Sequence, residues 1–137
     1  MVTFTLPFEL RALARRQPKA LYQLMLSVSS SLLKDFATRQ GLGQIGFTSV
    51  LHTHSRRRAL HPHLHIIVPN GGYDPKRKQW CKGKNGYLFN EFSLAKVWRA
   101  RVLDAIKNHP DLSLVNINKL PEKWVVDAKT SVMAYPR

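Results

Sequence analysis

The sequence predicts an α+β fold in which helices pack on one face of an antiparallel sheet. The expected strands and helices follow one another in the order β-α-α-β-β-hairpin-α-β-β, which favours this layered arrangement. Residues 45–52 and 61–68 are expected strands joined by a short connection, so they pair most simply as antiparallel neighbours. The chain has 137 residues, which is enough for one domain with a hydrophobic core.

Alternation and proline positions predict the amino-terminal elements. Residues 2–6 alternate β-branched or aromatic side chains and predict a strand that ends at Pro7. Residues 8–16 predict a short helix with a basic end, and Pro18 begins a longer helix that reaches about Arg39.

The longer helix has an apolar stripe at helical spacing, which is typical of a core-facing side. The stripe consists of Leu21, Met25, Val28, Leu32 and Phe36. Gly41 stands where a helix C-cap is expected. The serine run at residues 29–31 is expected on the solvated or small-residue side of the helix.

The strand at residues 61–68 carries the most informative pattern in the chain. Side chains alternate between the two faces of a strand, so three histidines share one face, namely His61, His63 and His65. The opposite face presents Leu64, Ile66 and Val68 to a core. In the preceding strand, Ile45, Phe47 and Leu51 fall on one face, and Thr48, Val50, His52 and His54 fall on the other. Antiparallel pairing would bring His52 and His54 near His61 and His63.

Turn and capping signals divide the second half of the chain. Asn70-Gly71-Gly72 and Asn85-Gly86 indicate turns within a basic, hairpin-like stretch. Ser93 is the expected N-cap of a helix that runs to about Asn108, with an inner face of Leu94, Val97, Trp98, Val102, Ala105 and Ile106. Residues 112–117 and 124–126 are expected to close the sheet.

The charge of the chain points to a polyanionic partner. There are 22 lysines and arginines against 8 acidic residues, a formal net charge of +14, and the isoelectric point is about 10.5. Nucleic acid is the default partner, and an anionic membrane surface is the alternative. The single cysteine, Cys81, excludes an internal disulfide and fits a reducing cytosol. Neither a signal peptide nor a membrane-spanning stretch is expected.

The histidine strand predicts a metal site. Neutral imidazole is a common metal ligand, His63 and His65 are the best pair, and His61 or His52 could complete the set. Such a site could accept a hard cation together with a phosphate oxygen, or zinc. None of the 8 acidic residues lies next to the histidines in sequence, which weakens a zinc hydrolase hypothesis. The alternative interpretation is a set of exposed or hydrogen-bonded histidines without a metal.

Two basic segments are candidates for contact with nucleic acid. Arginine forks match phosphate oxygens, and three arginines follow one another beside the histidine strand, namely Arg56, Arg57 and Arg58. A second segment interleaves cations and aromatic residues, which suits a backbone with unpaired bases; it contains Lys76, Arg77, Lys78, Trp80, Lys82, Lys84 and Tyr87. The alternatives are a solvated loop tip and a charged hairpin whose aromatic residues pack inward.

These residues resemble a known family. His63-Leu64-His65 resembles the His-hydrophobic-His motif of the HUH endonucleases. Together with Leu51-His52-Thr53, the string from His61 to Gly72 resembles the rolling-circle insertion-sequence transposases, the two-tyrosine HUH transposases of bacterial mobile elements. Residues 3–10 and 120–126 also resemble this family, so the resemblance covers residues 2 to about 127.

The resemblance implies a fold, a chemistry and a location. It implies an antiparallel sheet of about five strands with the histidine strand near its centre. It implies Mg²⁺ or Mn²⁺ polarising a scissile phosphate of single-stranded DNA, while a tyrosine attacks to give a 5′-phosphotyrosine and a free 3′-OH. His63 and His65 match the metal pair, and His61 and His52 match further family histidines. The partner would be single-stranded element ends in the bacterial cytoplasm, at the nucleoid.

The sequence departs from the family at two points. The family's Tyr-x-x-x-Tyr motif has no counterpart among Tyr22, Tyr73, Tyr87 and Tyr135. Only Tyr135 lies near the corresponding end, in a tail that does not resemble the family, so it is an unfavourable nucleophile. The family's amino-terminal cysteine-rich zinc module is missing too. We therefore expect a partial catalytic core at residues 1–127, a divergent or truncated tail at 128–137, and little strand transfer from this chain alone. The competing hypothesis is a non-catalytic nucleic-acid-binding module with structural histidines.

Overall fold

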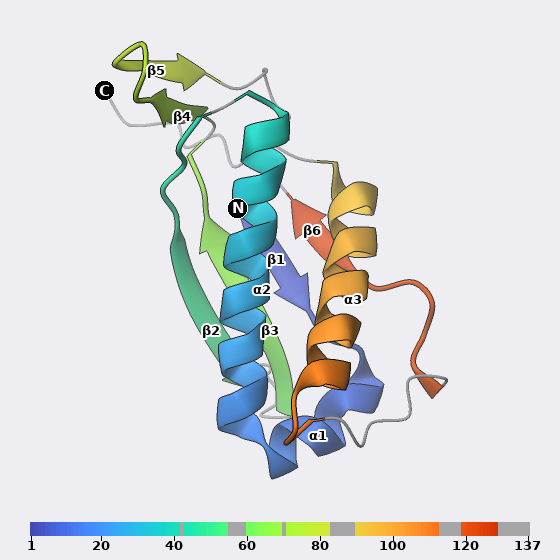
Figure 1. The fold of residues 1–137 in the computed structure, drawn as a ribbon. Coiled ribbons are helices and arrows are strands. Elements are labelled where there is room, and N and C mark those ends of the chain that lie inside the picture. Colours follow the sequence, from blue (N-terminus) through green and yellow to red (C-terminus); the bar gives the residue numbers. More distant parts are fainter. Residues whose placement is uncertain (42, 55–59, 70, 83–89, 113–118, 129–137) are drawn as a thin grey trace, which may run out of the picture.

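The computed structural model describes residues 1–41, 43–54, 60–69, 71–82, 90–112 and 119–128 (Figure 1). The elements in chain order are β1 (Val2–Thr5), η1 (Phe8–Leu10), α1 (Arg11–Arg16), α2 (Pro18–Arg39), β2 (Thr48–His54), β3 (Leu60–Ile67), β4 (Gly71–Asp74), β5 (Gln79–Lys82), α3 (Glu91–Asn108) and β6 (Val126–Ala128). Within these ranges, no helix combines the length and apolar character that a membrane span requires.

The main sheet has the strand order β2-β3-β1-β6, and each neighbouring pair is antiparallel. Helices α2 and α3 lie side by side across one face of this sheet (Figure 1). The α+β prediction is therefore confirmed. The described residues form 4 strands of this sheet, and β3 lies inside it between β2 and β1, as the resemblance implies. Of the expected strand at 112–117, residues 113–117 lie outside the described residues.

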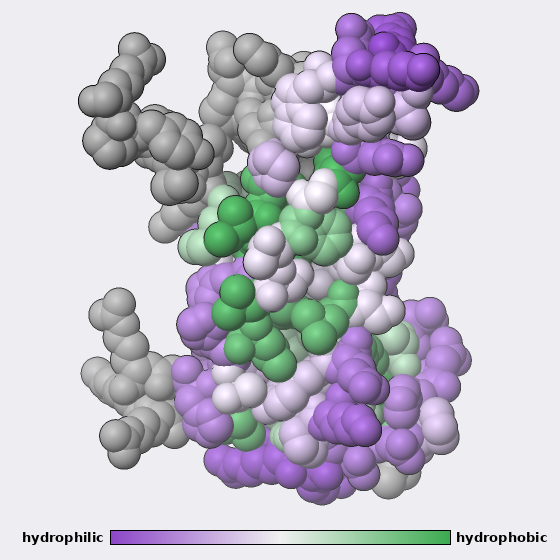
Figure 2. Space-filling model, turned by 90° about the vertical axis from the view of Figure 1, so that its left-hand side faces the viewer, coloured by the Kyte–Doolittle hydropathy of each residue, from purple (hydrophilic) through white to green (hydrophobic). Residues whose placement is uncertain are grey.

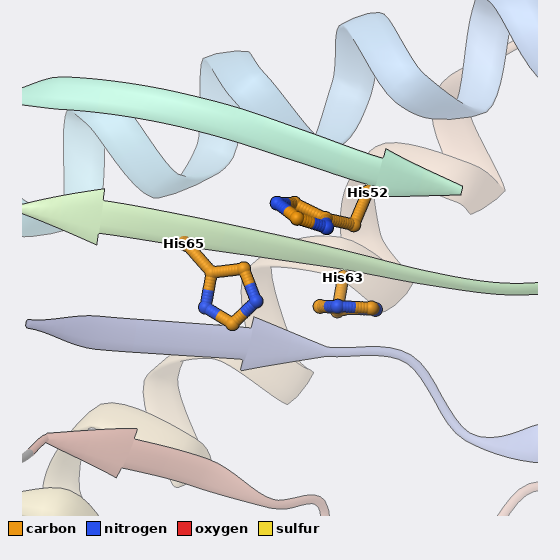
Figure 3. Close-up of side chains that lie close together, drawn as sticks. All are labelled: His52, His63 and His65. Atoms are coloured by element: carbon orange, nitrogen blue, oxygen red, sulfur yellow. The ribbon is translucent and has the colours of Figure 1, made fainter. Parts of the chain in front are cut away.

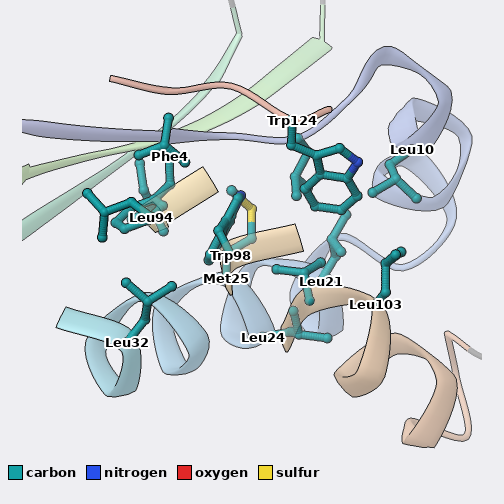
Figure 4. Packing of buried hydrophobic residues seen from close by; sticks show 14 of the residues in the cluster. Phe4, Leu10, Leu21, Leu24, Met25, Leu32, Leu94, Trp98, Leu103 and Trp124 are labelled. Carbon is teal, nitrogen blue, oxygen red and sulfur yellow. The ribbon is translucent and has the colours of Figure 1, made fainter. Parts of the chain in front are cut away.

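The core lies between the sheet and the two long helices (Figure 4). From β3 it receives Leu64 and Ile66, which are fully buried, with Val68 just beyond the strand. The expected faces of α2 and α3 are turned inward. Leu21, Met25, Leu32 and Phe36 are buried on α2, and Leu94, Trp98, Val102 and Ile106 are buried on α3. Val28, Val97 and Ala105 pack against the cluster while partly buried.

The serine run of α2 divides between core and surface. Ser29 is buried, and its hydroxyl donates to the carbonyl of Leu26 at 3.0 Å, so the buried polar group is satisfied within the helix. Ser31 is exposed and accepts a hydrogen bond from Arg101 of α3, which also pairs with Asp35 at 2.6 Å. The run therefore contributes both to core packing and to the hydrogen bonds between α2 and α3.

The boundaries of α2 follow the sequence signals, but the start of α3 does not. Helix α2 begins at Pro18 and ends at Arg39 as predicted, and Gly41 has the positive φ of 71° that suits the residue after a C-cap. Ser93 is not the N-cap of α3. The N-cap is Asn90, whose side-chain oxygen accepts a hydrogen bond from the backbone N–H of Ser93 at 3.1 Å. Asparagine caps a helix as well as serine does, so α3 begins earlier than predicted.

The basic stretch after β3 forms a hairpin with a different turn from the one predicted. Gly71 and Gly72 are buried within β4 rather than in a turn. The turn lies at residues 75–78, where the carboxylate of Asp74 accepts from the N–H groups of Lys76 and Arg77. Asn85-Gly86 lies outside the described residues. Two backbone hydrogen bonds between Gln44 and Tyr73, at 2.7 and 2.8 Å, connect the hairpin to the segment before β2.

Candidate metal centre

Three histidines from two adjacent strands lie together on the sheet face opposite the helices. In the antiparallel register of β2 and β3, His52 stands opposite His63 and Val50 stands opposite His65. Figure 3 shows the ring of His52 beside the two rings of β3. The potential ligand atoms of His52, His63 and His65 all lie within 4.8 Å of one another. Since a metal ion needs its ligands gathered within a few ångströms, the group fits a metal site.

Hydrogen bonds hold two of the three histidines of β3, namely His63 and His65. Nδ1 of His63 lies 2.8 Å from the carbonyl oxygen of His61. A carbonyl oxygen only accepts, so Nδ1 carries the proton and Nε2 keeps its lone pair for a ligand. Nδ1 of His65 lies 3.1 Å from the hydroxyl of Thr3 on β1, and when that hydroxyl accepts, Nε2 of His65 is free as well. Metal-binding histidines are commonly oriented in this way through their second ring nitrogen.

The environment favours the neutral form of the imidazole. Burial lowers the pKa of His65, and the neighbouring charges of His63 and His52 lower it further. Neutral imidazole is the form that binds a metal. The pKa shift of His65 therefore favours metal binding at neutral pH.

His61 is close to the group without being one of the three. Its ring centroid lies 5.7 Å from that of His63, and its carbonyl group is the part that contacts the His63 ring. Burial lowers the pKa of His61, with smaller contributions from His63 and Arg11. The structure thus gathers His52, His63 and His65, while His61 contributes through its backbone.

The donor set of the described group is three ring nitrogens with no carboxylate. Mg²⁺ prefers oxygen ligands and retains water, whereas imidazole suits transition metals such as Fe²⁺ and Zn²⁺. Three ligands also leave coordination positions open for substrate. The residues present therefore fit a divalent transition metal with open positions.

The candidate residues for DNA contact are only partly within the described residues. Lys76, Arg77, Lys78 and Trp80 are exposed on the β4–β5 hairpin, and Lys82 ends β5. Hydrophilic residues gather at the upper end of the side shown in Figure 2, at the height of this hairpin. Arg56, Arg57, Arg58, Lys84, Tyr87 and Tyr135 lie outside the described residues.

Sequence reasoning missed one residue of the hairpin surface. Tyr73 pairs directly with Trp80 across β4 and β5, so both side chains leave the hairpin on the same face. They are 42% and 52% exposed, which is high for large aromatic residues. Recognising residues 71–74 as a strand would have revealed the pair.

The Thr3–His65 contact leads to a specific expectation. The change Thr3→Val keeps the size of the side chain and removes the hydroxyl, so we expect affinity for Mn²⁺ to fall about tenfold, as for other residues that orient metal ligands. Isothermal titration calorimetry measures this effect. Thr48→Val, on an exposed position of β2, is the control. Equal affinities of the two variants for Mn²⁺ would show that Thr3 does not orient His65.

The fold and the histidine group define an α+β protein with a candidate metal centre on the sheet face that the long helices leave open. The chain belongs to a transposase family: the family model Y2_Tnp, described as "Putative transposase", matches residues 46–134. This range contains all three histidines of the group and the β4–β5 hairpin.

Two curated proteins are similar to the chain. It is 33% identical over 108 residues to "Putative transposase y4qJ" of Sinorhizobium fredii (strain NBRC 101917 / NGR234), a match that covers 77% of this chain and 27% of that protein. It is 36% identical over 74 residues to "Transposase for insertion sequence element IS801" of Pseudomonas savastanoi pv. phaseolicola, covering 54% of this chain and 17% of that protein. The matches thus span about a quarter or less of the relatives' length. No solved structure matches the chain significantly.

Proposed function

We propose that this chain is the metal- and single-stranded-DNA-binding core of a rolling-circle transposase. The observation that carries this proposal is the group of three imidazoles on two neighbouring strands, with ligand atoms within 4.8 Å. Membership of a transposase family makes DNA the substrate class. Work on DNA in a bacterium would place the protein at the nucleoid in the cytoplasm.

His52, His63 and His65 would hold the divalent metal. We propose Mn²⁺ rather than Mg²⁺, because Mg²⁺ takes oxygen ligands and gives up its water reluctantly, whereas Mn²⁺ belongs to the transition-metal series that binds nitrogen sites. A metal in this position supplies Lewis-acid polarisation of a phosphate oxygen. His63 and His65 are partly buried, and His52 is exposed at the edge strand β2. A phosphate group can therefore approach from the open side of the sheet while the hydrogen bonds of β3 keep the rings oriented.

The β4–β5 hairpin would bind the DNA strand through charge and stacking. Lys76, Arg77 and Lys78 lie at its turn, and a chain with a net charge of +14 attracts the backbone over a longer range. Tyr73 and Trp80 offer an exposed aromatic pair on one face. Unpaired bases stack on such surfaces without sequence preference, which favours single strands over duplex.

The tyrosine step of the family's chemistry has no assigned residue here. Burial raises the pKa of Tyr22, which opposes the ionised form that attacks a phosphate. Tyr73 serves the hairpin surface, and Tyr87 and Tyr135 lie outside the described residues. The part of the reaction that we propose for this chain is binding the metal and holding the DNA strand.

Removing the exposed tryptophan tests the binding surface. Trp80→Ala is expected to weaken binding of a fluorescent oligothymidylate about tenfold, because stacking contributes about 1–3 kcal/mol per base. Fluorescence anisotropy measures the affinity in the presence of Mn²⁺. Phe92→Ala is the matched control, since Phe92 is another aromatic residue and is 88% exposed on α3.

The metal part of the proposal is tested in the same titration. We expect EDTA to weaken binding by the wild type and to have no effect on His63→Ala. Binding that is the same with Mn²⁺ and with EDTA would support instead a nucleic-acid-binding module whose histidines are structural. A higher affinity for duplex DNA than for the single strand would contradict the proposed substrate.

A further inference from the structure

A second group of cationic and polar side chains lines a pocket beyond the end of the histidine row. The pocket has a volume of about 470 Å³ and is open to solvent. It lies where α1 and the start of α2 meet the end of β2 and the start of β3. In the part of the chain that the structure describes, its polar lining is Arg11, Arg15, Tyr22 and His54. Among the residues that the structure describes, none that lines it is acidic.

Arg11 has an unsatisfied donor. Its Nε atom is buried and has no hydrogen-bond partner among the described residues, whereas buried polar groups in native proteins almost always have one. The guanidinium carbon lies 4.2 Å from the centre of the Phe8 ring, and this cation–π contact holds the group in place. An acceptor is therefore the missing partner, and a planar guanidinium best matches an oxyanion.

The other polar groups of the pocket also suit an oxyanion. Arg15 supplies a second guanidinium, and Tyr22 supplies a hydroxyl that burial keeps in its protonated, donating form by raising its pKa. The ring of His54 is held through Nδ1, 2.8 Å from the hydroxyl of Thr53, which leaves Nε2 on the other side of the ring. Two fixed positive charges with additional donors are the composition of a phosphate site.

We propose that this pocket binds a phosphate group, and that in this protein the group is a phosphodiester of the DNA backbone beside the one at the metal centre. The assignment to DNA rests on the proposed function; the affinity for phosphate does not. His54 lies two residues after His52 on β2, which corresponds to about 7 Å along a strand. The pocket therefore lies near the metal centre, at the end of the sheet where α1 and α2 meet β2 and β3, and a phosphate bound there would set the direction in which the DNA strand leaves the metal centre.

The test compares two arginines of the same helix. Arg15 lines the pocket, and its neighbour Arg16 is exposed and does not. Affinity for a fluorescent oligothymidylate is measured by anisotropy at several salt concentrations, with EDTA present to exclude the metal. Arg15→Gln is expected to weaken binding about three- to tenfold and to reduce the salt slope by about one, the signature of a lost phosphate contact. Arg16→Gln is expected to bind like the wild type.

Equal effects of Arg15→Gln and Arg16→Gln would overturn the proposal. Because Arg15 is exposed, its replacement leaves the fold intact, and circular dichroism checks this. Arg11→Gln removes the other guanidinium of the pocket and is also expected to weaken binding of the oligothymidylate.

A separate titration with sodium phosphate distinguishes the source of the phosphate. It follows the arginine side-chain N–H signals by NMR, and signals of Arg11 and Arg15 are expected to shift. Shifts without any effect of Arg15→Gln on DNA affinity would overturn the assignment to the DNA backbone and leave a free phosphate as the ligand. If the wild type binds no single-stranded DNA, the proposed function fails, while the phosphate titration still decides whether the pocket binds an oxyanion.

Discussion

Replacing His63 by alanine is expected to weaken binding of Mn²⁺ by at least about 100-fold, more than the loss of a residue that only orients a ligand. The three rings lie at similar distances from one another: the ring centroid of His63 is 5.1 Å from that of His52 and 4.8 Å from that of His65, and the other two are 4.7 Å apart. Without it, two ligands remain. Calorimetry measures the affinity directly, and a thermal shift reports it independently, since a metal at about 100 times its Kd stabilises the fold by about 2.7 kcal/mol.

A second histidine variant serves as the control. His109 follows α3, where its Nδ1 accepts from the backbone N–H of Asp111, and it is not one of the three. His109→Gln keeps an acceptor at that position and is expected to bind Mn²⁺ like the wild type. Equal affinities of wild type and His63→Ala would show that the histidines of β3 do not hold the ion.

Replacing Trp98 by alanine is expected to cause the largest loss of stability. Trp98 is fully buried, its Nε1 donates to the carbonyl of Thr5 at 2.9 Å, and its ring lies 4.6 Å from that of Phe4. Such truncations cost about 3–5 kcal/mol, out of a typical free energy of unfolding of about 5–15 kcal/mol. Urea unfolding measures the change.

Two further variants separate the contributions to this loss. Trp98→Phe keeps most of the packing and removes the hydrogen bond to the Thr5 carbonyl, so we expect a cost of about 0.5–1.5 kcal/mol. Phe92→Ala, on an exposed position of the same helix, is expected to change stability by no more than about 0.5 kcal/mol. A cost below about 1 kcal/mol for Trp98→Ala would mean that α3 is not the element that anchors β1.

The histidine strand was predictable because its pattern is local. Strand alternation alone assigns His63 and His65 to one face and Leu64 to the other, and the burial of Leu64 and Ile66 agrees. The third member of the group was not predictable. Whether His52 or His61 joins the pair depends on the register between β2 and β3, which shifts between His52 and His54. Such an irregularity depends on the tertiary structure.

The hairpin shows how a strong local signal can mislead. Consecutive glycines are typical of turns, yet Gly71 and Gly72 are buried in β4. Nearby, a Cβ atom on Gly43 would lie only 2.5 Å from the carbonyl oxygen of Tyr73. The close approach of two backbones thus requires glycine at Gly43. The sequence does not show which chain segments come together, so the pairing of Tyr73 with Trp80 could not be predicted from it either.

The pocket at the end of the histidine row could not be predicted for a similar reason. Arg11 and Arg15 lie on α1, Tyr22 lies on α2, and His54 ends β2. In the sequence, Arg15 belongs to the basic end of a predicted short helix, Arg11 lies within that helix, and Tyr22 lies in the next predicted helix. Only the packing of α1 against the end of the sheet brings them to one cavity.

The most direct test of the central claim, that His52, His63 and His65 bind a metal together, is pulsed EPR of the Mn²⁺-loaded wild-type chain. We expect electron–nuclear couplings to imidazole nitrogens from three histidines, reduced in number when any one of the three is replaced. Couplings to water protons alone, with no nitrogen in the first coordination sphere, would contradict the claim.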